Sequence, residues 1–114
     1  MPRERRRFQR AGEALEVRYR EAGTLGEPWR VGTAISLSAG GLRFRSEGAF
    51  AADTLLSLQL RLPGAAEPAA LSGRIVWHQL QASGVTEVGV EFLDVTETQC
   101  ALIDQLVAFL NKRV

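Results

Sequence analysis

The chain has 114 residues, of which 46% are hydrophobic and 24% are charged, and its formal net charge at pH 7 is +1. This length suits about one ordinary domain with a single core, and this composition excludes the disordered and fibrous classes. The apolar runs are too short to span a bilayer or to form a secretory signal, so we expect a cytoplasmic protein without membrane attachment. The single cysteine, Cys100, excludes an internal disulfide and a multi-cysteine zinc site.

The first predicted segment is an arginine-rich arm, which we place at residues 1–12, ahead of a single domain at 13–114. Residues 3–10 read RERRRFQR, with five arginines and one acid, whereas the rest of the chain has 9 basic and 12 acidic residues. Because the arm lacks apolar periodicity, we expect it to be flexible until it is bound. Positive charge confined to so short a segment favours one compact anionic target over a nucleic acid.

Short segments in which apolar and polar residues alternate follow the arm and predict β-strands. They are ALEVRYR, RVGTAISLS, GLRFRS, LLSLQLRLP, LSGRIVWHQL and EVGVEFLDV. In RVGTAISLS, simple alternation places Val31, Ile35 and Leu37 on one face of the strand and Ser36 and Ser38 on the other.

The end of the chain changes to helical periodicity, with apolar residues three or four positions apart: Leu102, Ile103, Leu106, Phe109 and Leu110. Thr96 and Gln99 form a capping-box pattern, so we predict a helix over about 96–112. Six antiparallel strands and one helix over an open end describe a mostly-β fold, a small barrel, since closure removes exposed strand edges.

Two segments have the chemistry to bind a ligand, and the first is RRFQR. Its Arg6 and Arg10 are spaced as RxxxR, and a guanidinium can donate two parallel hydrogen bonds to a phosphate or to the O6 and N7 edge of guanine. Taken alone, however, a run of arginines is more typical of a solvated tail.

The second segment is SLSAGG, at the end of one predicted strand and the start of the next. Ser36 and Ser38 place two hydroxyls on one face, and Gly40 and Gly41 allow a phosphate to approach the backbone N–H groups closely. Taken alone, the glycine pair also suits any tight hairpin turn.

Together the two segments resemble the signature of the PilZ domain family, bacterial receptors for the second messenger cyclic di-GMP. That signature is RxxxR followed by [D/N]xSxxG; Arg6 and Arg10 match the first part, and Ser38 and Gly41 match the second. GRIVW, GVEF and the closing helix also look like the second half of the family. The resemblance implies a six-stranded antiparallel PilZ-type β-barrel that binds cyclic di-GMP between the flexible arm and the SLSAGG turn.

The resemblance implies a ligand site made from both segments and a nearby tryptophan: Arg5, Arg6, Arg7, Arg10, Ser36, Ser38, Gly40, Gly41 and Trp77. Arg6 and Arg10 would be the main ligands, with Arg5 and Arg7 as helpers. The sequence leaves open whether Trp77 packs near the ligand or inside the core. Ser36 replaces the Asp or Asn of the family, and losing that acceptor for guanine would weaken the affinity about ten- to a hundred-fold.

The sequence predicts no enzyme. His78 is the only histidine, and it has no convincing catalytic partners. No GxxxxGK[ST], GxGxxG or metal-ligand motif occurs, so we expect no catalytic residue, metal or cofactor. Our leading hypothesis is a cyclic di-GMP receptor that orders its arm on binding and thereby signals to a separate, unidentified protein partner.

Two alternatives and one open question remain. The first alternative is a degenerate PilZ domain that binds no nucleotide and acts as a protein-interaction module in motility or secretion. A barrel that binds nucleic acid is disfavoured, because aromatic residues make up only 7% of the chain. The sequence does not decide between a monomer and a dimer.

Overall fold

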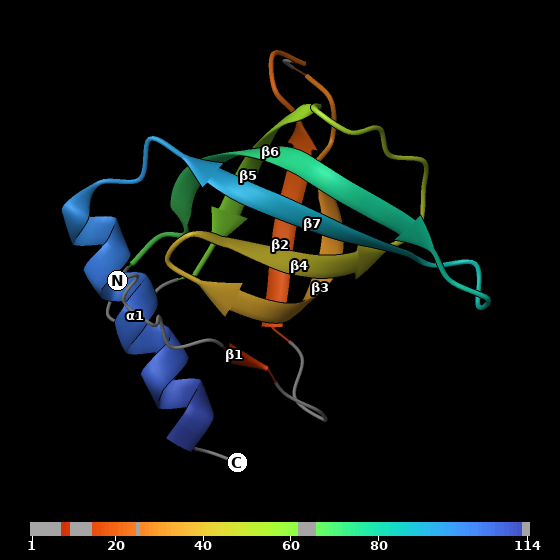
Figure 1. The fold of residues 1–114 in the computed structure, drawn as a ribbon. Helices are drawn as coiled ribbons and strands as arrows, with labels where there is room; N and C mark the ends of the chain where they lie inside the picture. Colours follow the sequence, from red (N-terminus) through yellow and green to blue (C-terminus); the bar gives the residue numbers. More distant parts are fainter. Residues whose placement is uncertain (1–7, 10–14, 25, 62–65, 113–114) are drawn as a thin grey trace.

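The computed structural model describes residues 8–9, 15–24, 26–61 and 66–112 (Figure 1). These residues form seven strands and one helix: β1 (Phe8–Gln9), β2 (Leu15–Glu21), β3 (Arg30–Ser38), β4 (Gly41–Ser46), β5 (Leu55–Leu60), β6 (Ala69–Leu80), β7 (Thr86–Leu93) and α1 (Glu97–Lys112). The predicted mostly-β fold with a C-terminal helix is therefore confirmed. No helix in the described ranges is long and apolar enough to cross a membrane.

Strands β2 to β7 form a closed antiparallel barrel, as predicted. Their order around the sheet is β3-β2-β5-β6-β7-β4, and a further antiparallel pairing between β3 and β4 closes the ring. Each of the six strands consequently has a partner on both sides, which satisfies their backbone hydrogen bonds without an exposed edge. The short strand β1 lies beside the end of β3, where Phe8 pairs with Leu37 and Gln9 pairs with Ser36.

The barrel interior is filled by the apolar residues that alternate along the strands. Tyr19 and Phe44, which are at most 2% exposed, pack with their ring centroids 4.8 Å apart. Helix α1 adds Ile103 and Val107 to this core, both completely buried. Ile103 and Leu106 of the predicted stripe are buried, but Phe109 is 54% exposed, because the buried face of the helix includes Val107 in its place.

Strand β3 departs from simple alternation through a β-bulge. In its pairing with β4, Ile35 is an extra residue between the paired positions Ala34 and Ser36. An extra residue shifts the inward and outward positions by one. Val31 is therefore 54% exposed, whereas Leu37 is 1% exposed. The prediction that Val31 and Leu37 share a face of this strand was wrong for that reason.

The capping box predicted at the start of the helix is confirmed. The backbone N–H of Gln99 donates to Thr96 Oγ1 at 3.1 Å, and the backbone N–H of Thr96 donates to Gln99 Oε1 at 3.1 Å. These two bonds satisfy donors that lack a partner within the helix, so the helix begins at Glu97.

Replacing Thr96 with alanine is expected to lower the free energy of unfolding by about 1 kcal/mol, because the N–H of Gln99 loses its acceptor. Urea denaturation measures this change. Thr98→Ala is the matched control, since Thr98 is an exposed threonine inside the first turn of the helix. A loss of equal size in both variants would show that the cap does not fix the start of α1.

Candidate functional site

The SLSAGG segment forms a tight connection between β3 and β4. Strand β3 ends at Ser38, strand β4 starts at Gly41, and these two residues pair with each other. The backbone N–H of Gly40 donates to Ser38 Oγ at 3.2 Å, and the carbonyl of Gly40 accepts a hydrogen bond of 2.9 Å from the N–H of Phe92. The turn is thus bound to β7 as well as to its own strands.

The two glycines of this turn have different surroundings. A Cβ added to Gly41 would lie 2.1 Å from the carbonyl oxygen of Val90 in β7, which is closer than any real contact. A Cβ added to Gly40 would have Ser38 Oγ as its nearest neighbour, at 3.8 Å. Gly41 is therefore required by the close approach of β4 to β7, whereas Gly40 leaves open space above the turn.

A hollow of about 400 Å³ lies beside this turn. Its walls come from four strands and the turn: Ser36, Ser38, Gly40, Gly41, Leu42, Arg43, Val76, Trp77, Gly89, Val90 and Glu91. Every described residue that the sequence singled out for the ligand site lines it. The structure thus places SLSAGG beside Trp77, and the ligand role of these residues stays a prediction.

Trp77 lies on the surface, which answers the question that the sequence left open. Val76 is an extra residue in the pairing of β6 with β7, between the paired positions Ile75 and Trp77. Ile75 is 1% exposed, and this bulge turns the indole outward, so that Trp77 is 36% exposed. The indole lies against Gly89, where a Cβ would be 2.4 Å from the indole nitrogen.

Replacing Gly89 with alanine is expected to displace the indole of Trp77 into solvent, because a surface side chain can rotate away more readily than β7 can shift. In a Trp29→Phe background, the tryptophan emission should move to longer wavelength and acrylamide should quench it more strongly. Gly40→Ala adds the same methyl group near the hollow without touching the indole, and serves as the control. Unchanged emission from Gly89→Ala would contradict the packing of Trp77 on Gly89.

Charged residues of both signs surround the hollow. Glu91 is the only acid among its described lining residues, and Arg74 Nη2 donates to Glu91 Oε1 at 2.7 Å. This hydrogen bond, together with the charge of Glu91, raises the pKa of the Arg74 guanidinium. Arg43, the basic lining residue, lies 3.9 Å from Glu87. Arg74 thus offsets the one carboxylate that would repel an anion.

The arginine arm lies almost entirely outside the described residues. Arg5, Arg6, Arg7 and Arg10 are not described, so their roles and the flexibility of residues 1–12 stay predictions. The two residues between Arg7 and Arg10 form β1, which pairs with the part of β3 that contains Ser36. The centre of RRFQR therefore lies against a strand that lines the hollow.

Sequence reasoning missed every lining residue that β7 contributes to this hollow, including Gly89 and Glu91. Both lie on β7, and they reach the hollow because β7 pairs with β4 on one side and with β6 on the other. A pairing between segments so far apart in sequence leaves no local signal in either segment.

A family model for the PilZ domain matches residues 4–109. The chain belongs to the PilZ family. The match covers the barrel, the SLSAGG turn and most of α1, and it includes the RRFQR segment. No curated protein has a matching sequence.

Solved structures with this fold include several PilZ proteins. The PilZ domain of YcgR from Escherichia coli, solved with cyclic di-GMP, has a TM-score of 0.73 at 12% identity, over 99% of this chain and 94% of that one. MotI/DgrA, an inhibitor of motility from Bacillus subtilis, has a TM-score of 0.71 at 19% identity, over 100% of this chain and 54% of its own. The MrkH complex with cyclic di-GMP from K. pneumonia has a TM-score of 0.70 at 12% identity, over 99% of this chain and 53% of that one.

At these identities the likeness concerns the fold. The chain spans about half the length of MotI/DgrA and of MrkH, and nearly the whole length of the solved YcgR domain. It thus corresponds to one PilZ domain.

Proposed function

We propose that this PilZ domain is a receptor for cyclic di-GMP, which binds in the hollow beside the SLSAGG turn and is held there by the RRFQR arginines. The observation that supports this most directly is the pairing of β1 with β3. Arg7 and Arg10 are the sequence neighbours of β1, and Arg6 is one residue further. Phe8 and Gln9, at the centre of RRFQR, thus pair with the end of β3 that leads into the SLSAGG turn, which supports a shared site for the two segments.

The residues around the hollow suit the parts of a cyclic dinucleotide. Arginine side chains donate paired hydrogen bonds to phosphate oxygens and to the guanine edge, and the Ser38 hydroxyl can donate to a phosphate. The exposed face of Trp77 can pack on a base or on an arginine. YcgR and MrkH have both been solved with cyclic di-GMP, which supports this class of ligand.

Ser36 marks the one departure from the family signature. It is 4% exposed, so its hydroxyl presents little surface to a ligand, and it lacks the two oxygens of a carboxylate. We therefore expect binding that depends on the arginines more than on this position. Ser36 is also the observation that favours the second candidate, a PilZ domain that binds a protein and no nucleotide.

Isothermal titration of the purified protein with cyclic di-GMP tests the proposal, with cyclic di-AMP as the control ligand. Saturable binding that prefers the guanine dinucleotide supports a receptor, and its ordered arm then forms the surface for a separate protein partner. If neither heat nor thermal stabilisation is detected at the highest soluble ligand concentration, the receptor proposal is wrong and the protein-binding candidate replaces it.

A further inference from the structure

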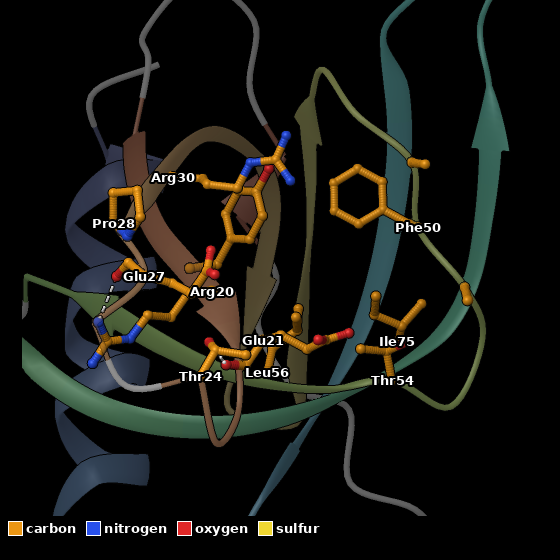
Figure 2. A pocket seen from close by; sticks show the side chains of 13 residues that line it. Arg20, Glu21, Thr24, Glu27, Pro28, Arg30, Phe50, Thr54, Leu56 and Ile75 are labelled. Carbon is orange, nitrogen blue, oxygen red and sulfur yellow. Dashed lines mark hydrogen bonds between the residues drawn. The ribbon is translucent and has the colours of Figure 1, made fainter.

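A second hollow, of about 420 Å³, lies at the other end of the barrel (Figure 2). Strand β3 starts at Arg30 beside this hollow and ends at Ser38 beside the first one. Leu56 and Ile75, which point into the barrel, form an apolar base. In Figure 2, Arg30 and Phe50 stand on two sides of the opening. A volume of this size falls within the range of sites for small molecules, about 300–1,000 Å³.

Hydrogen bonds hold the two connections that form the walls of this hollow. In the connection between β4 and β5, the N–H of Asp53 donates to the carbonyl of Ile75 at 2.7 Å. In the connection between β2 and β3, Arg20 Nη1 donates to the carbonyl of Glu27 at 2.8 Å, and its guanidinium lies 4.2 Å from the ring centroid of Trp29. The walls are therefore shaped before any ligand enters, which reduces the entropic cost of binding.

The aromatic ring of Tyr19 and the backbone of Gly48 position Arg30 at the opening. Its guanidinium lies 5.9 Å from the ring centroid of Tyr19 and directly against Gly48, where a Cβ would be 2.7 Å from Nη2. Its one hydrogen bond among the described residues is a long one, from Nη2 to the carbonyl of Glu47 at 3.4 Å. No ion pair joins Arg30 to an acid in that part of the chain, so donors remain for a ligand carboxylate.

Two carboxylates line the same hollow. Glu21 and Glu27 are both exposed, and within the described ranges neither forms an ion pair with Arg30 or with any other cation. Opposite charges that line one hollow without pairing can each bind the opposite charge of a molecule that has both an anion and a cation.

We propose that this hollow binds an α-amino acid with a large apolar side chain. Its carboxylate accepts hydrogen bonds from Arg30, its ammonium group faces Glu21 and Glu27, and its side chain packs on Phe50 and the apolar base. A phosphate ester fits worse, because Glu21 and Glu27 offset the charges of Arg20 and Arg30 and leave no net positive charge for a dianion. A purely apolar molecule fits worse because it would cover the four charged side chains of the lining without pairing them.

The test titrates the uniformly ¹⁵N-labelled protein with L-phenylalanine and follows the backbone amides by NMR. We expect saturable shifts at Tyr19, Phe50 and Ile75, and none at the turn between Ser38 and Gly41. Three analogues each lack one feature: L-phenylalaninamide lacks the carboxylate, N-acetyl-L-phenylalanine lacks the ammonium group, and glycine lacks the side chain. Each should bind about tenfold more weakly or worse. Absent shifts, or equal affinity for the analogues, would overturn the proposal.

Arg30→Gln tests the carboxylate contact, and we expect it to weaken L-phenylalanine binding about tenfold or more. Arg18→Gln is the matched control, because Arg18 is an exposed arginine on the neighbouring strand that pairs with Glu16 outside this hollow. Equal affinity in both variants would overturn the assignment of Arg30. If Arg30→Gln does not fold, the analogue series still tests the proposed amino-acid site, because it uses the unaltered protein. Titration with cyclic di-GMP reports on the other hollow, so the two proposals fail separately.

Discussion

Replacing Arg10 or Arg6 with alanine is expected to weaken cyclic di-GMP binding about a hundredfold or more while leaving the melting temperature unchanged. Each guanidinium would donate paired hydrogen bonds to a charged or polar ligand group, and each bond to a charged partner contributes about 1.5–3 kcal/mol. Neither arginine belongs to the alternating apolar pattern that fills the barrel. Isothermal titration measures the affinity, and thermal unfolding monitors the fold.

Arg18→Ala is the control for these two variants. It removes the same guanidinium from an exposed position on β2, where the contact is a surface ion pair with Glu16. Surface pairs of this kind contribute at most about 1 kcal/mol, so affinity and stability should both stay near those of the wild type. If Arg6→Ala and Arg10→Ala retain affinity within threefold, the arginine roles are wrong.

Replacing Gly41 with alanine is expected to lower the free energy of unfolding by about 3 kcal/mol or more, since the added methyl group overpacks a rigid contact. The atom it would meet is the carbonyl oxygen of Val90, at 2.1 Å. A backbone atom cannot rotate away, so β4 and β7 must separate. For a domain of this size the melting temperature should fall by more than about 10 °C. Calorimetry or circular dichroism measures this.

Gly40→Ala is the control, because the same methyl group there meets only Ser38 Oγ, at 3.8 Å. We expect its melting temperature to stay within a few degrees of the wild type. Equal stability of the Gly41 and Gly40 variants would show that the close approach of β4 to β7 does not require glycine. Because Gly41→Ala is expected to destabilise the barrel, a loss of ligand binding in this variant would not by itself show that Gly41 contacts the ligand.

Much of the fold could be predicted from local patterns. Period-two alternation identified the six strands of the barrel, and the pair Thr96 and Gln99 identified the start of α1. The two bulges, at Ile35 and Val76, could not be predicted, because an extra residue is defined only against the partner strand. Those bulges are what expose Val31 and turn Trp77 toward the surface.

The candidate site was predicted as two separate segments and one tryptophan, and the structure gathers its described members around one hollow. The contributions of Gly89 and Glu91 depend on how β7 pairs with β4 and β6, which no local pattern encodes. The second hollow was not predicted either. It results from Arg30 folding over its paired neighbour Tyr19 and from two connections whose shape is set by long-range hydrogen bonds.

The strand order also divides the barrel into two consecutive three-stranded meanders, β2-β3-β4 and β5-β6-β7, which meet only along two seams, β2–β5 and β4–β7. The hollow beside the SLSAGG turn crosses the β4–β7 seam, and the hollow beside Arg30 crosses the β2–β5 seam. A molecule bound in either hollow touches both meanders and stabilises the closed barrel over any state in which that seam has opened. A ligand bound in one hollow should therefore slow amide hydrogen exchange along the seam which that hollow crosses. The two ligands would then protect different sets of backbone amides.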